Sequence, residues 1–143
     1  MDTSEKYIKM CSKATEIQEI KKNAGYYVSG DFVYCDNIDI IHIASYEEGF
    51  AINESAPIDI NFPFSGKLLK TVFLPRQDQL QEMVIPEEVS SNWDWMRKFI
   101  LKTGSRYYID FSSFEQLWLA FVMKEKYNKV WDEKQEDWVK IDL

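Results

Sequence analysis

Cysteine and histidine, which often bind metals or act in nucleophilic catalysis, are scarce in this 143-residue chain, which has two Cys and one His. Two cysteines are too few for the disulfide framework of a small secreted domain, and Cys11 and Cys35 lack the spacing of paired metal ligands. We therefore expect two buried thiols. The sequence also lacks a Gly-x-Ser-x-Gly motif, a phosphate-binding loop and a dinucleotide-binding motif. No cofactor is expected, and an enzymatic role is not the favoured interpretation.

Long apolar segments are absent as well. The run from Leu117 to Met123 is short, whereas about 20 apolar residues are needed to cross a bilayer. Residues 1–6 are polar and charged, unlike the start of a signal peptide. We therefore expect a cytoplasmic protein that does not bind membranes. With 45% hydrophobic residues, five Gly and four Pro, the chain has the composition of a folded protein, and its length favours a single domain over 1–143.

Positive charge is missing from one long stretch of the chain. Residues 23–66 contain seven acidic residues and no Lys or Arg, and the formal net charge of the whole chain is −7. Nucleic-acid affinity depends on Lys and Arg at the phosphates, so no direct nucleic-acid binding is expected. The stretch 23–66 is either a solvated surface or a row of carboxylates that imitates nucleic acid and inhibits a host DNA-binding protein.

The first half of the chain is expected to hold one helix followed by strands. Apolar residues recur at steps of three and four over 3–22, which predicts an amphipathic helix. Apolar, β-branched and aromatic runs between turn residues then predict a hairpin over 26–35, a well-buried strand over 38–45 and a strand over 68–74. Residues 53–66, which include two prolines, should form loop or edge structure.

The second half is expected to be mostly helical. Periodicity predicts helices over 76–84 and 92–103, the latter with Trp93, Met96, Phe99 and Ile100 at helical spacing. Ser112 and Glu115 have the spacing of a capping box, which predicts a helix from there to about Tyr127. Its most buried side chains should be Phe114, Leu117, Trp118 and Phe121. A hairpin should follow, with Val130–Trp131 and Trp138–Val139 as its arms.

This order of elements sets the predicted fold class. The strands are grouped in the first half of the chain instead of alternating with helices. Such grouping favours an α+β fold with an antiparallel sheet over a βαβ arrangement. The predicted architecture is therefore an N-terminal helix, an antiparallel β-sheet, C-terminal helices and a terminal hairpin.

Asp36, Asp39 and His42 are the strongest candidates for a metal site. Carboxylates and imidazole suit a divalent ion, which would permit hydrolysis of a nucleotide or nucleic acid. Positions three apart on a strand point to opposite faces, however, so these side chains converge only if the backbone bends. His42 by itself is more typical of a sheet residue with a hydrogen-bond partner. A metal-dependent hydrolase is therefore kept as an alternative function.

All five tryptophans lie at or after position 93. Trp95 is two residues from Trp93 on a predicted helix, so the two point to different sides. Trp131 and Trp138 lie in a short hairpin that we expect to bury only one of its faces. We therefore predict an exposed group of Trp95, Trp131 and Trp138 that binds a protein partner or forms a homodimer. Aromatic packing in the core is the alternative interpretation.

Two segments carry a resemblance to known proteins. They are LPRQDQLQEM over 74–83, and EQLWLAFVM over 115–123 continuing to Tyr127 and Val130–Asp132. Together they resemble a group of small bacteriophage and prophage proteins of Gram-positive bacteria, over roughly the C-terminal half of the chain. The group has no assigned activity, so the resemblance implies only a setting, the cytoplasm of a host bacterium. The leading hypothesis is a non-catalytic phage accessory protein that acts through protein–protein contacts.

Overall fold

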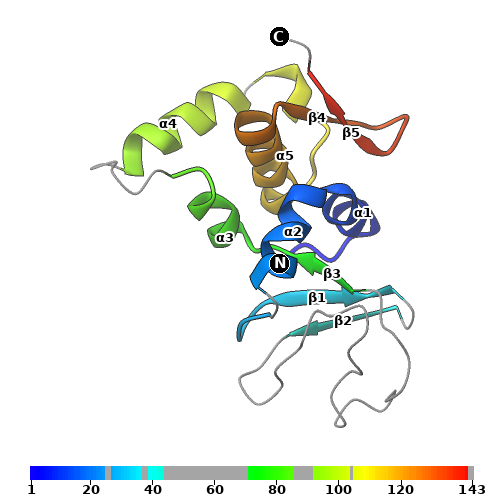
Figure 1. Cartoon of the computed structure of the whole chain (residues 1–143). Helices are drawn as coiled ribbons and strands as arrows, with labels where there is room; N and C mark the ends of the chain where they lie inside the picture. Colours follow the sequence, from blue (N-terminus) through cyan, green and yellow to red (C-terminus); the bar gives the residue numbers. More distant parts are fainter. Residues whose placement is uncertain (25–26, 37–38, 44–70, 86–91, 104, 142–143) are drawn as a thin grey trace, which may run out of the picture. The chain divides into compact units, whose positions relative to one another are not determined.

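The structure, a computed structural model, describes residues 1–24, 27–36, 39–43, 71–85, 92–103 and 105–141 (Figure 1). The side chains of His42, Thr103 and residues 92–96 lie outside this description. Helices are combined with antiparallel strands, so the predicted α+β class is confirmed. No helix among the described residues is long and apolar enough to cross a membrane.

The chain groups into two compact units. The first contains Met1–Met10 and Arg76–Leu143, and the second contains Cys11–Pro75. The prediction of a single domain over 1–143 stays a prediction, because this grouping does not establish whether either unit folds alone.

The N-terminal helix is broken in two. Instead of one helix over 3–22, the chain forms α1 (Glu5–Lys13) and α2 (Thr15–Ala24). The side-chain amide of Gln18 donates a hydrogen bond of 3.0 Å to the backbone carbonyl oxygen of Cys11, just before the break. A carbonyl near the end of α1 therefore keeps a partner although the regular helix stops.

The sheet of the second unit has the strand order β2-β1-β3, with both pairings antiparallel. β1 (Phe32–Cys35) is the central strand, between β2 (Ile40–Ile43) and β3 (Thr71–Leu74). The hairpin predicted over 26–35 is wrong, because both sides of β1 pair with strands that come later in the chain. The prediction for 68–74 is confirmed over the four residues of β3, and the loop predicted over 53–66 lies outside the described residues.

β2 differs from its prediction in burial. A well-buried strand was expected over 38–45, but Ile40 and Ile43 are 46% and 52% exposed. The reason is the strand order, which places β2 at an edge of the described sheet. Both cysteines are buried free thiols, as predicted.

The other edge of the described sheet is held by the side chain of Gln18 from α2. Its Oε1 accepts a hydrogen bond of 2.8 Å from the backbone N–H of Phe73, and its Nε2 donates one of 3.0 Å to the carbonyl oxygen of Phe73. The amide group thus satisfies both backbone groups that β3 presents at this residue, as a neighbouring strand would do. Figure 1 shows α2 beside β3 in agreement with these bonds.

The first unit is built around α5 (Phe114–Tyr127). This helix contacts α3 (Gln77–Glu82), α4 (Asn92–Thr103) and the strand that follows it. The predicted helices over 76–84 and 92–103 are therefore confirmed, and a 3-10 turn, η2 (Arg106–Tyr108), leads from α4 toward α5.

The prediction for α5 needs two corrections. Its N-cap is Ser113 instead of Ser112, and the Ser113 hydroxyl accepts a hydrogen bond from the backbone N–H of Gln116. Trp118 and Phe121 are buried as predicted and Leu117 is half-buried, but Phe114 is 64% exposed. The helix ends at Asn128, which has the left-handed conformation common after a final turn.

Gln116 is a buried polar residue at the start of α5. Its Nε2 donates hydrogen bonds to the Asp2 carboxylate at 2.8 Å and to the Ser4 hydroxyl at 3.2 Å. Its Oε1 accepts from the backbone N–H of Ser112. Because its amide group is fully paired, Gln116 ties the N-terminal segment to α5 without leaving a buried polar group unsatisfied.

Candidate interaction surface

Two of the three tryptophans in the predicted interaction surface are buried. Trp131 in β4 (Lys129–Asp132) and Trp138 in β5 (Asp137–Lys140) are 5% and 7% exposed. The two residues face each other across the hairpin, with ring centres 5.3 Å apart. Cross-strand partners point to the same face of a hairpin, so one buried face is enough to cover both tryptophans. The prediction that the hairpin leaves at least one of them exposed is therefore wrong.

A hydrogen bond fixes the inner face of this hairpin. The indole N–H of Trp138 donates a hydrogen bond of 2.9 Å to the carbonyl oxygen of Met10. Met10 is the last residue of α1 that belongs to the first unit. Lys6 and Lys9 of α1 form ion pairs with Glu133 and Glu136 of the hairpin turn. Binding of a partner by Trp131 and Trp138 would require this packing to open. The side chain of Trp95 lies outside the described residues.

The proposed metal ligands are only partly described. Asp36 and Asp39 are exposed, and the hydroxyl of Tyr34 donates a hydrogen bond of 3.1 Å to Oδ1 of Asp39. Among the residues with described side chains, no three of His, Cys, Asp or Glu gather where they could hold a metal ion. The imidazole of His42 is not among those side chains, so a metal site at these three residues stays an untested alternative.

The cysteines do not have the surroundings of nucleophiles. Cys11 and Cys35 are both buried, and burial raises the pKa of the Cys35 thiol. Reactive cysteines require the opposite, a partly exposed thiol with a lowered pKa. The structure therefore assigns both to packing.

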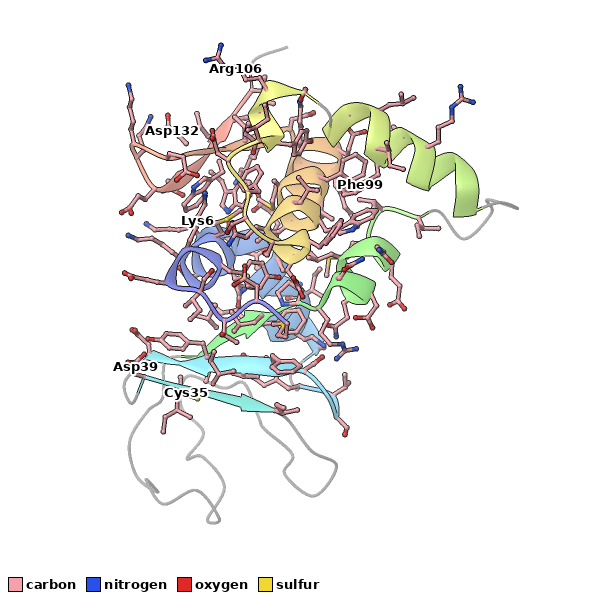
Figure 2. The ribbon with its side chains drawn as sticks, turned by 180° about the vertical axis from the view of Figure 1, so that it is seen from behind. Lys6, Cys35, Asp39, Phe99, Arg106 and Asp132 are labelled. Carbon is pink, nitrogen blue, oxygen red and sulfur yellow. The ribbon has the colours of Figure 1, made fainter. Side chains whose placement is uncertain are left out.

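α4 has one face that packs inside the first unit. The Phe99 ring stacks on the Trp118 indole with ring centres 3.8 Å apart and an angle of 4° between the planes. The same Phe99 ring meets Phe121 edge to face at 5.3 Å. Figure 2 shows Phe99 between α4 and α5.

Ion pairs hold the same side of α4. Glu125 of α5 accepts from Lys98 at 3.1 Å and from Lys102. Burial alone would raise the pKa of the Glu125 carboxyl, but hydrogen bonds from the two lysines outweigh it and hold this pKa below its usual range. Lys98 and Lys102 are four residues apart and so lie on one side of the helix.

The opposite side of α4 is apolar and exposed. Ile100 is 60% exposed and Leu101 is 69% exposed, and Arg97 shares their side of the helix because it lies three and four residues before them. Arg106 follows in η2 and projects outward in Figure 2. Neither arginine guanidinium forms an ion pair with the described part of the chain. We call Arg97, Ile100 and Leu101 the α4 outer face.

The sequence pattern did not identify this face. Ile100 was grouped with Phe99 on one apolar side, although adjacent helical positions are about 100° apart. The useful signal was the pair Lys98 and Lys102, which flanks Phe99 and has an acidic partner, Glu125, on α5. That pairing turns Ile100 and Leu101 toward solvent.

A second group of rings lies where η2 meets the hairpin. The Tyr107 hydroxyl accepts a hydrogen bond of 2.8 Å from the backbone N–H of Trp131. The ammonium of Lys124 lies 5.4 Å and 5.5 Å from the ring centres of Tyr107 and Tyr108. The Tyr108 hydroxyl and the Trp131 indole N–H are buried and have no hydrogen-bond partner among the described residues. These groups belong to the packing of the first unit and form no open site.

Comparison with known proteins gives no relative for this chain. No protein-family model matches it, and neither a curated protein nor a solved structure gives a significant match.

Proposed function

We propose that this chain is a non-catalytic accessory protein that binds another protein through the α4 outer face. The observation that carries the proposal is the exposure of Ile100 and Leu101, at 60% and 69%. The other side of α4 already packs on α5. Ile100 and Leu101 are therefore not needed to hold α4 in the fold. Adjacent exposed aliphatic residues on one helix face are typical of contact surfaces.

The charge on this face supports a specific contact. Arg97 lies on the same side of α4 as the aliphatic pair and has no ion-pair partner in the described residues. Arginine is enriched in protein interfaces because its guanidinium forms several directed hydrogen bonds at once. An acidic and apolar partner surface would satisfy both parts of the α4 outer face.

The setting we propose is a phage or prophage product that acts in a bacterial host. Its support is the resemblance of the segments 74–83 and 115–132 to small phage proteins. In the structure these segments form most of α3 and α5, which contact each other in the first unit. The two segments on which the resemblance rests thus belong to the packed centre of the first unit.

The enzymatic alternative receives less support. Asp36 and Asp39 are exposed carboxylates, and one of them is already held by the Tyr34 hydroxyl. A nucleic-acid mimic built from 23–66 stays a further alternative, and it predicts a basic partner with steep salt dependence.

The test uses the whole chain as bait in a host lysate, followed by binding measurements with the purified partner. The variant Ile100→Ser/Leu101→Ser should weaken binding of that partner about tenfold or more, because two apolar contacts are lost. The control is Phe114→Ser, which removes an equally exposed apolar side chain. Phe114 lies on α5 and is not part of the α4 outer face.

Two results would contradict the proposal. A purified partner that binds wild type and Ile100→Ser/Leu101→Ser equally well would remove the α4 outer face from the interface. Capture of a partner whose affinity falls only with Asp36→Ala, Asp39→Ala or His42→Ala would favour the alternatives. Circular-dichroism melts of all variants check that the fold is retained.

A further inference from the structure

We infer that Glu125 of α5 is the positioning residue of the α4 outer face: it fixes the rotation of α4 and so keeps Ile100 and Leu101 exposed. This inference rests on the proposed function above, since it names the residue that presents the same surface. Glu125 itself is not expected to touch the partner, because it pairs with the side of α4 that packs on α5.

Burial of apolar surface does not by itself select one rotation of α4. Phe99, Ile100 and Leu101 are consecutive apolar residues, and consecutive helical positions are about 100° apart. The three side chains therefore leave the helix in different directions over about 200° of its circumference. Phe99 is 4% exposed, whereas the next two residues are exposed. A turn of α4 by about 100° would exchange Phe99 for Ile100 and still bury an apolar side chain.

The Glu125 carboxylate distinguishes between these rotations because it pairs twice with α4. Its Oε2 lies 3.1 Å from the Lys98 ammonium, and its Oε1 pairs with the Lys102 ammonium. The two lysines flank Phe99 and lie one turn apart on the same side of the helix. A turn of α4 by about 100° would carry both ammonium groups away from Glu125. The double pairing thus specifies one rotation, as a single buried polar residue specifies one register in a coiled coil.

A second contact, two turns away on α5, requires the same rotation. The Phe99 ring stacks on the Trp118 indole, seven residues before Glu125 and about 10 Å from it along α5. Two contacts at this separation fix the direction of α4 as well as its rotation. The Glu125 side chain is only 15% exposed, so its attraction to the lysines is screened less than that of a surface ion pair.

The test measures the exposure of single methyl groups in the whole chain by nuclear magnetic resonance. A neutral paramagnetic chelate in the solution speeds the relaxation of methyl groups that solvent can reach. In wild type this effect should be strong at Ile100 and Leu101 and absent at Leu119, which is fully buried. Ile109 is 73% exposed and lies outside α4, so its methyl groups are an internal reference that should not change in any variant.

Three charge variants test the role of the carboxylate. Glu125→Lys brings three ammonium groups together, and Lys98→Glu/Lys102→Glu brings three carboxylates together. In each, α4 should turn, and paramagnetic relaxation at Ile100 and Leu101 should fall about twofold or more, because it follows the population of the exposed rotation. The combined variant Glu125→Lys/Lys98→Glu/Lys102→Glu restores opposite charges and should recover the wild-type values.

Affinity for the partner purified with the whole chain should follow the same order. It should fall with each of the first two variants and recover with the combined one. The combined variant keeps the reversed lysines, so this recovery cannot come from direct contact of those lysines with the partner. The matched control is Glu133→Gln, which breaks the exposed pair with Lys6 in the hairpin turn and should leave both measurements as in wild type.

The outcomes separate this inference from the proposed function. Unchanged relaxation at Ile100 and Leu101 in Glu125→Lys, or no recovery in the combined variant, would overturn the positioning role. If the partner still loses affinity with Ile100→Ser/Leu101→Ser, the proposed function then holds without it. If relaxation responds as expected but the partner binds Ile100→Ser/Leu101→Ser as tightly as wild type, Glu125 positions α4 and the proposed function fails.

Discussion

The Lys21 ammonium lies 2.6 Å from Oδ2 of Asp31, whose carboxylate has no exposed surface. The same oxygen accepts a hydrogen bond of 2.9 Å from the backbone N–H of Val28. On its other side the ammonium lies 4.7 Å from the centre of the Phe73 ring. A buried carboxylate is tolerated only when it is paired, so this contact connects α2, the turn before β1, and β3 within the second unit.

Loss of the Lys21 charge should therefore destabilise the protein strongly. In Lys21→Met the Asp31 carboxylate remains buried without its ammonium partner, which costs about 3–5 kcal/mol. The matched control is Lys9→Met, which breaks the exposed pair with Glu136 and should cost about 0–1 kcal/mol. Urea unfolding at neutral pH measures both. Equal losses for the two variants would show that the Asp31 pair does not hold the second unit.

The centre of the first unit should depend on Trp118. Its indole is buried and contacts both Phe99 and Phe121, so Trp118→Ala should cost about 3–5 kcal/mol. The control is Phe114→Ala in the same helix, which removes an exposed ring and should change stability by about 0.5 kcal/mol or less. Thermal melts followed by circular dichroism compare the two. An unchanged midpoint for Trp118→Ala would exclude the stacked rings from the core.

The second half of the fold was predictable because its signals are local. Periodicity and capping residues within about 15 residues of sequence specify each element of this half. These elements are the helices over 76–84 and 92–103, α5, and the hairpin after Asn128. The first half depends on distant partners. β1 pairs with Thr71–Leu74, some 40 residues later in the chain, and no local pattern identifies that pairing.

The candidate site was harder to predict because burial is a tertiary property. Trp131 and Trp138 were assigned to an exposed surface, since the sequence does not show that they are cross-strand partners on one face. Ile100 was grouped with Phe99 by helical spacing, which does not show which of the two side chains is buried. The break at Ala14 was also missed, because the apolar residues keep their helical spacing across it.

The two adjacent tyrosines should respond in opposite ways to loss of their hydroxyl groups. Tyr107→Phe leaves the Trp131 backbone N–H without its acceptor and should cost about 1–3 kcal/mol. Tyr108→Phe removes a buried hydroxyl that has no partner among the described residues, so stability should stay the same or rise by about 1 kcal/mol. Urea unfolding of the two variants side by side is the measurement. A larger loss for Tyr108→Phe would reveal a partner for its hydroxyl.

Stability should fall at alkaline pH because of the same pair. Burial raises the pKa of Tyr107 to about 12 from an ordinary value of 10, against the lowering effect of its bond to Trp131. Burial likewise raises the pKa of Tyr108. In the unfolded chain these phenols lose their protons near pH 10, while in the folded chain they keep them. Their contribution to stability is therefore complete below about pH 10 and is lost as pH rises toward 12, by at most about 1.4 kcal/mol per pH unit for each phenol.

Comparison with Tyr107→Phe isolates the contribution of one phenol. Other groups, including the lysines, also titrate in this range, but they are shared by both proteins. Below pH 10 wild type should be more stable than the variant because of the bond to Trp131. From pH 10 upward the difference should shrink, because only wild type must keep a buried phenol protonated at position 107. Urea unfolding of both proteins at pH 8, 9, 10 and 11 measures this difference. A difference that stays constant up to pH 11 would mean that the Tyr107 phenol titrates alike in the folded and unfolded chains.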